Sequence, residues 1–239
     1  MNSTRTIAVI TGVLFIIATL AGPILATALT PDLTGSDTLS QFSAETNQAA
    51  GGVLLWIISA FTSAGIAIAM YPLLKEKNTG LALGSVIFRA MEAVFYMVGV
   101  MSLLSLLTLG QQFIAAGAAD RTSLQTIGKL LVSVRDCAAL LAVFAFCAGA
   151  FMYYSVLFRS WLIPRWLSGF GIVAITLLNP ACLLALFSGN RITSYILLAA
   201  PIALQEIVMA VWLIVKGFSP SASTSRSGET ATNELLSAA

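Results

Sequence analysis

The sequence predicts an all-α protein, a polytopic membrane bundle of six transmembrane helices with both termini in the cytoplasm. Hydrophobic residues make up 58% of the chain and charged residues only 9%, whereas soluble domains carry about 25% charged residues. Long apolar runs recur between residues 7 and 218 with short polar breaks, and six of them are long enough for the roughly 20 residues that cross a bilayer. We therefore expect one membrane domain, residues 1–218, that contains all six spans.

The first span is expected over residues 7–29, which is longer than the roughly 7–15-residue apolar core of a signal peptide. Pro23 should kink this helix. We interpret the span as a permanent anchor. A cleaved signal peptide is the alternative, because Ala26-Thr27-Ala28 resembles an A-x-A cleavage site.

A polar connection over residues 30–50 carries acidic side chains and no basic one, so we expect it outside the cell. A short helix capped by Ser36 or Asp37 is expected within it. The second span is expected over residues 51–74. The basic turn that follows, residues 75–78, is typical of a cytoplasmic connection.

The third span, expected over residues 80–110, holds an arginine and a glutamate one helical turn apart in an otherwise apolar segment. Arg89 and Glu92 share a helix face with Tyr96, and Glu92 should lie about 18 Å from the cytoplasmic edge of a hydrocarbon core roughly 30 Å thick. An isolated charge there costs roughly 2.5–3.5 kcal/mol or more. These side chains must therefore have partners, and the overlong span should tilt or protrude outward.

The fourth span is expected over residues 124–157, with Arg135 and Asp136 near its outer end, either as an outer gate or simply at the interface. Neighbouring side chains on a helix point about 100° apart, so these two are not expected to satisfy only one another. The corner over residues 159–166 combines arginines with tryptophans, which is typical of a cytoplasmic interface.

The last two spans each carry polar residues within an apolar run. Asn179 precedes a proline in the fifth span, residues 167–187, which favours a kink with a polar lining. Gln205 and Glu206 lie at the centre of the sixth span, residues 195–215, and Glu206 should reach almost the same depth as Glu92. The tail over residues 219–239 has the composition of a disordered cytoplasmic segment.

Basic residues support this topology in a multi-pass protein of the cell's inner membrane. Lysine and arginine concentrate in cytoplasmic connections, and the residues on the proposed inner side are Arg5, Lys75, Lys77, Arg159, Arg165, Lys216 and Arg226. The residues expected outside are Arg121, Lys129 and Arg191.

Several kinds of chemistry are excluded or disfavoured. The chain has no histidine, which excludes bis-histidine haem, most zinc chemistry and a Ser-His-Asp triad. Cys137, Cys147 and Cys182 lie inside apolar spans without metal-ligand spacing, so we interpret them as small buried hydrophobic residues. We expect no cofactor, no metal and no nucleic acid. The expected partners are the lipid bilayer and a small-molecule or cation ligand, and a homo-oligomer stays open because small residues over 65–69 allow close helix packing.

Three stretches together resemble a known family. They are FRAMEAVFY, FRSWLIPRWL and LQEIVMAVWLIVKG, and they resemble the prokaryotic integral-membrane family catalogued as domain of unknown function 4386 over nearly the whole chain. Ser168-Gly169 after the PRWL run is a slight departure from the family pattern. The resemblance implies no activity, and the family positions that it carries over are Arg89, Glu92, Pro164, Arg165, Trp166, Glu206, Trp212, Lys216 and Gly217.

The sequence therefore predicts a polar site at the membrane midplane, formed mainly by the third and sixth spans. The candidate ligand-binding or polar-core residues are Arg89, Glu92, Tyr96, Arg135, Asp136, Asn179, Gln205 and Glu206. Two carboxylates around one guanidinium leave a net negative charge unless Arg135 helps or one carboxylate holds a proton.

Three functions fit this cluster. The favoured one is binding or transport of a small molecule or cation at the midplane. The alternative is a structural or accessory subunit in which a buried ion pair ties the third span to the sixth. A further alternative is an intramembrane enzyme that uses Glu92 or Glu206 as general acid or base on a lipid-like substrate. The lack of histidine and of a metal set counts against the enzyme.

Overall fold

The computed structural model describes residues 3–33, 35 and 37–219, and these residues form helices and connections without a strand. Six helical segments among them are long and apolar enough to cross a membrane, which confirms the predicted all-α six-span class. Ser36 and residues 220–239 of the expected tail lie outside the described residues. The elements are α1 (Ser3–Thr19), η1 (Leu20–Ala26), α2 (Thr27–Leu29), α3 (Thr38–Ala44), α4 (Thr46–Leu74), α5 (Thr79–Ala115), α6 (Ala118–Ser160), α7 (Arg165–Ser188), η2 (Ile192–Tyr195) and α8 (Ile196–Val215).

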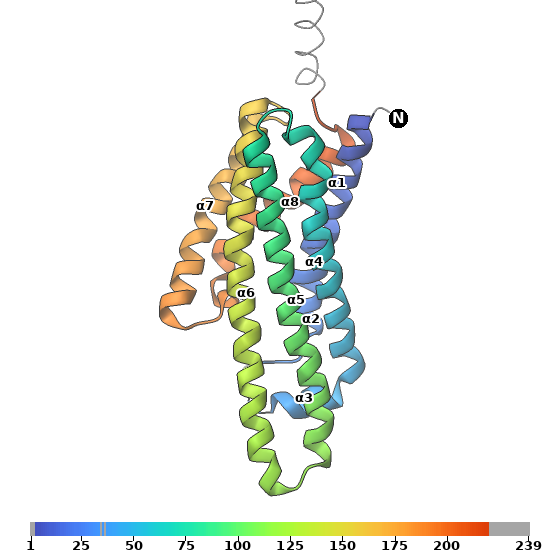
Figure 1. Cartoon of the computed structure of the whole chain (residues 1–239), viewed down its shortest axis with the longest axis vertical. Helices are drawn as coiled ribbons and strands as arrows, with labels where there is room; N and C mark the ends of the chain where they lie inside the picture. The colour runs from blue at the N-terminus through green and yellow to red at the C-terminus, as the bar shows by residue number, and fades with distance from the viewer. Residues whose placement is uncertain (1–2, 34, 36, 220–239) are drawn as a thin grey trace, which may run out of the picture.

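The six long helices form a closed ring in chain order. α1 packs against α4, α4 against α5, α5 against α6, α6 against α7 and α7 against α8, and α8 returns to α1. The N-terminus, the α4–α5 turn and the α6–α7 turn lie at one end of the bundle, which we call the N-terminal end, and α3 lies toward the opposite end (Figure 1). At the N-terminal end Arg5 Nη2 donates a 2.6 Å hydrogen bond to the carbonyl of Ile214, so the start of α1 holds the end of α8.

α5 and α6 are the longest helices, with 37 and 43 residues. They extend well past α7 at the end opposite the N-terminus (Figure 1). There α3 packs against α5, and the side chain of Phe42 is fully buried. This projection accommodates the surplus length of the third and fourth spans.

The first span changes its helical geometry around Pro23. The residues of η1 form a π-helical segment with Pro23 inside it, because proline lacks the N–H that an α-helix needs at that point and a wider turn accommodates the gap. A Cβ atom at the preceding Gly22 would lie 2.4 Å from Ser59 Oγ, so only glycine allows η1 to approach α4 this closely. Ser59 Oγ also donates a 3.1 Å hydrogen bond to the carbonyl of Ala18.

Buried hydrophobic side chains form two clusters. One cluster includes Phe15, Met70 and Tyr153 from the helix halves nearer the N-terminal end, and the other includes Phe42 and Leu106 near the opposite end. Side chains of both clusters also line a cavity in the middle of the ring. The cavity is where the buried charges lie.

Candidate functional site

The central cavity has a volume of about 270 Å³ and is bounded by all six long helical segments. Its volume is large compared with the roughly 30 Å³ that one water occupies in the liquid. Five of the eight candidate residues line it, namely Arg89, Glu92, Tyr96, Arg135 and Glu206. The other lining side chains that matter for its chemistry are Thr19, Trp56, Ser59, Ser63 and Phe146.

On one side of the cavity, Arg89 and Glu92 form an ion pair within α5. They are three residues apart, so they lie on the same helix face, and Arg89 Nη1 is 2.9 Å from Glu92 Oε2. The two residues are only 2% and 3% exposed. Phe146 on α6 covers the guanidinium, whose central carbon lies 4.9 Å from the ring centre. The pair therefore neutralises itself locally.

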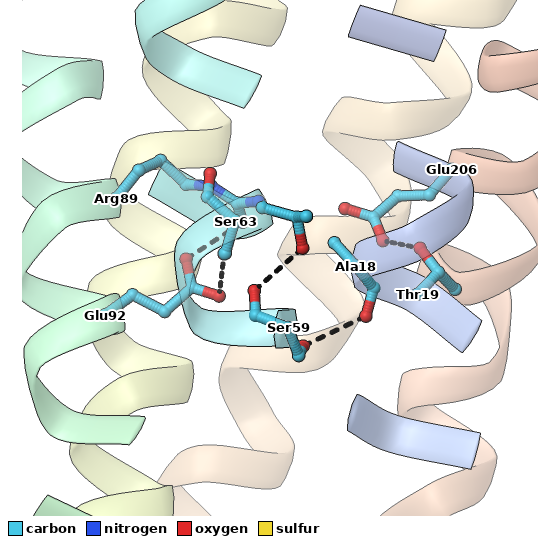
Figure 2. Close-up of polar contacts among 8 residues, drawn as sticks. Ala18, Thr19, Ser59, Ser63, Arg89, Glu92 and Glu206 are labelled. Carbon is cyan, nitrogen blue, oxygen red and sulfur yellow. Dashed lines mark hydrogen bonds and ion pairs between the residues drawn. The ribbon is translucent and has the colours of Figure 1, made fainter. Parts of the chain in front are cut away.

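Ser63 on α4 connects to both members of this pair. Its hydroxyl donates a 2.7 Å hydrogen bond to Glu92 Oε1, and its carbonyl accepts a 3.2 Å hydrogen bond from Arg89 Nε. Figure 2 shows Ser63 between the two side chains. These bonds join α4 to α5, and they add to the ion pair the hydrogen bonds that a buried charge needs.

Across the cavity, Glu206 on α8 has a neutral partner instead. Thr19 Oγ1 on α1 donates a 2.9 Å hydrogen bond to Glu206 Oε2. Within the described part of the chain, no ion pair reaches Glu206. The other carboxylate oxygen points toward the side of the cavity where Ser63 and Arg89 lie (Figure 2). Since the residue is only 9% exposed, an ionised Glu206 would be a buried charge without a direct ionic partner.

This arrangement contradicts the alternative in which a buried ion pair ties the third span to the sixth. The ion pair is internal to α5, its hydrogen bonds reach α4, and Glu206 is bonded to α1. The reason is the ring order: α5 neighbours α4 and α6, and α8 neighbours α7 and α1. The third and sixth spans therefore face each other across the cavity rather than packing together.

A second ionic group lies on α6 and the α7–α8 connection. Arg135 Nη1 lies 2.9 Å from Asp136 Oδ1, and Arg191 Nε lies 3.1 Å from Asp136 Oδ2. The sequence predicted that Arg135 and Asp136 do not satisfy only one another, and Arg191 is the additional partner. The Arg135 side chain lines the cavity, but Asp136 does not.

Asn179 and Gln205 do not line the cavity. Asn179 Nδ2 donates to the carbonyl of Ile175 on its own helix, at 3.0 Å. Gln205 accepts a hydrogen bond from the Tyr154 hydroxyl on α6 and donates one of 3.2 Å to the carbonyl of Leu167 on α7. It points away from the cavity because adjacent side chains on a helix point about 100° apart. Gln205 therefore links α8 to α6 and α7, whereas Asn179 bonds within α7.

Sequence reasoning missed Thr19, Ser59 and Ser63. The available signal was the four-residue spacing of the two serines, which places them on one face of α4. That signal is weak, because serine and threonine are common at helix interfaces in membranes.

Among the described residues no group of three aspartate, glutamate or cysteine side chains could hold a metal ion. Cys147 and Cys182 are buried, as expected. Cys137 is exposed on the surface of α6, so the prediction that it is buried was wrong.

A family model described as a domain of unknown function, DUF4386, matches residues 10–217. No curated protein and no solved structure matches the chain.

Proposed function

The chain belongs to the DUF4386 family of domains of unknown function, and from its site we propose that it binds a small amine or other small monovalent cation in the central cavity. This is the binding step that a transporter would also require. The proposal follows from the charges around the cavity.

One observation carries the proposal: Glu206 is a buried carboxylate that faces the cavity without a cationic partner in the described residues. Arg89 is already paired with Glu92 at 2.9 Å. A buried charge without a partner is strongly unfavourable, and ionisable residues inside membrane spans mark functional sites. A ligand with one positive charge would pair with the Glu206 carboxylate, because Arg135, the other cation of the cavity wall, already lies 2.9 Å from Asp136.

The aromatic side chains of the cavity wall can hold a cation, because the guanidinium carbon of Arg135 already lies 5.8 Å from the centre of the Trp56 ring. Trp56 and Tyr96 line the cavity and lie close together, with ring centres 5.3 Å apart. The faces of such rings attract cations, and quaternary ammonium ligands are bound in this way in other proteins. In the absence of a ligand, a proton on Glu206 would supply the balancing charge, so ligand and proton would compete for this carboxylate.

We also propose that the N-terminal end of the bundle faces the cytoplasm and that the protein lies in the inner membrane of a cell. Six of the basic residues are at or near this end: Arg5, Lys75, Lys77, Arg159, Arg165 and Lys216. Lysine and arginine accumulate on the cytoplasmic side of membrane proteins. In this orientation the end of the cavity that Arg135 lines would face the outside of the cell.

A purely structural role is the second candidate, and Ser63 is the observation that favours it. Its two hydrogen bonds make the Arg89–Glu92 pair a link between α4 and α5. Such a link can fix helix register without any ligand. The structural role concerns the α4–α5 side of the cavity, and it leaves Glu206 unexplained.

A binding experiment on the purified full chain in mild detergent distinguishes cation binding from a purely structural role. Thermal unfolding is followed during titration with ethylammonium and with tetramethylammonium, in the unaltered protein and in Glu206→Gln. Glu76→Gln, which removes an exposed carboxylate in the α4–α5 turn, is the matched control. We expect cation-dependent stabilisation in the unaltered protein and in Glu76→Gln, and none in Glu206→Gln. Equal responses of all three proteins would contradict the proposal.

A further inference from the structure

The cavity is elongated, and its chemistry changes along its length. From η2 it is lined by Ile192, and from α8 by Ile196, Ala199, Ile202, Ala203 and Glu206, among others. These residues follow helical spacing and share one face. Along α8 the distance from Ile196 to Glu206 is about 15 Å at 1.5 Å per residue. The carboxylate is therefore at one end of a mostly apolar wall.

Two small side chains keep this wall open beside the carboxylate. Ala203 and Ala199 precede Glu206 by about one and two helical turns, and both line the cavity. The facing wall from α6 is also apolar here, with Ala139 and Val143. An inorganic cation would gain nothing from such a wall, because it needs polar ligands. An alkyl group would gain free energy by leaving water.

The end of the cavity away from Glu206 meets the outer surface of the bundle. Pro23 and Thr27 line the cavity from the first span, and both are exposed. On α8, Ile196 lines it and is 65% exposed. α1 packs against α8, but the π-helical segment η1 packs against α4, so the seam between the first and last spans opens beside Pro23.

This opening lies within the apolar spans, not in a polar loop. Pro23 belongs to the candidate membrane span Thr4–Leu29, and Ile196 belongs to Ile192–Val215. In a membrane the opening would therefore be surrounded by lipid. A ligand that reaches the cavity through it must tolerate an apolar environment.

Building on the proposed function, we infer that the ligand is an amphipathic amine. Its ammonium group binds at Glu206, and its alkyl part lies against the apolar face of α8 and extends toward the opening between η1 and α8. The inference specifies the ligand class of the same cavity, so it depends on cation binding at Glu206.

The test is a chain-length series of primary amines. Isothermal titration measures the affinity of the unaltered protein for ethylammonium, butylammonium and hexylammonium. Burial of each methylene should raise affinity by about fourfold, so hexylammonium should bind on the order of 100-fold more tightly than ethylammonium. Affinities that do not depend on chain length would overturn the inference.

A matched pair of variants locates the alkyl group. Ala199→Phe should fill the apolar part of the cavity, because Ala199 lines it, whereas Ala200→Phe adds the same side chain at an exposed position that does not. We expect Ala199→Phe to weaken hexylammonium binding at least about tenfold, and to weaken it more than it weakens ethylammonium binding. Ala200→Phe should change neither. Equal effects of the two variants on hexylammonium would overturn the placement along α8.

The outcomes distinguish this inference from the proposed function. If all three amines bind with equal affinity and Glu206→Gln abolishes their binding, the amphipathic ligand is wrong and cation binding stands. If no amine binds, or if Glu206→Gln binds them equally well, the proposed function itself is wrong. The chain-length series in the unaltered protein decides the inference even if Ala199→Phe fails to fold.

Discussion

The hydroxyl of Thr19 donates a hydrogen bond of 2.9 Å to the carboxylate of Glu206, which lies 187 residues later in the chain. This bond joins the first span to the last at the seam that closes the helical ring. It also leaves the carboxylate without a counter-charge from the residues that the structure covers. The proposed cation site follows from this relationship.

Removal of the Thr19 hydroxyl should destabilise the protein. Thr19→Val is nearly isosteric and leaves Glu206 without its hydrogen-bond donor, so we expect the free energy of unfolding to fall by about 1–3 kcal/mol. Chemical unfolding in detergent measures this change. Thr62→Val is the matched control, because the Thr62 hydroxyl bonds only to carbonyls of its own helix, and it should have a much smaller effect.

A double variant tests whether the Thr19 effect comes from this bond. Thr19→Val combined with Glu206→Leu removes both polar partners, so the combined loss should be clearly smaller than the sum of the two single losses. Additive losses would argue against a direct interaction.

The Arg89–Glu92 pair should behave as a structural unit. Arg89→Met leaves a buried carboxylate unpaired, so we expect a loss of about 3–5 kcal/mol in the free energy of unfolding, and Glu92→Leu should cost a similar amount. The double variant Arg89→Met with Glu92→Leu should be more stable than either single variant. Thermal and chemical unfolding of the three proteins measure this. A double variant that is less stable than both singles would contradict the description of an internally neutralised pair.

Amine binding should weaken as the pH is lowered. A protonated Glu206 has no charge to offer an ammonium group, so the proton and the ligand exclude each other. We expect the affinity for tetramethylammonium to fall by up to about tenfold per pH unit over the range in which the carboxylate titrates. The quaternary ion carries no proton of its own, so any pH dependence comes from the protein. Titrations from about pH 9 to about pH 4 measure it, and an affinity that stays constant would exclude competition at a carboxylate.

Gly22 should resist substitution because of its contact with α4. Gly22→Ala places a methyl group 2.4 Å from Ser59 Oγ, so η1 and α4 must separate. We expect the variant to lose about 1–3 kcal/mol of stability. Gly117→Ala is the control, because a Cβ at Gly117 would have no atom within 4 Å. Equal stability of the two variants, measured by unfolding, would show that η1 does not need this close approach.

The fold class could be predicted because it depends on two local features of the chain. These are the length of each apolar segment and the positions of the charged residues between the segments. The interruptions around Lys75 and Arg159 coincide with the ends of α4 and α6. The effect of Pro23 was also predictable as a departure from straight helix, since it depends on one missing N–H. The π-helical form of η1 was not, because a proline can also kink an α-helix without widening its turns.

The polar site could be predicted only in part. The depth of Glu92 and Glu206 follows from counting residues along each helix, and both line one cavity. Their partners, Ser63 and Thr19, could not be deduced, because depth along a helix does not specify which helices are neighbours in the ring. The same limit led to the inclusion of Gln205, which has nearly the same depth as Glu206 but points to α6 and α7.

Native mass spectrometry of the full chain with added butylammonium tests the central claim most directly. The unaltered protein, Glu206→Gln and the control Glu76→Gln are released from mild detergent at the same amine concentration. The account predicts one bound butylammonium on the unaltered protein and on Glu76→Gln, and none on Glu206→Gln. Equal occupancy of the three proteins, or no bound amine on any of them, would contradict a cation site at Glu206.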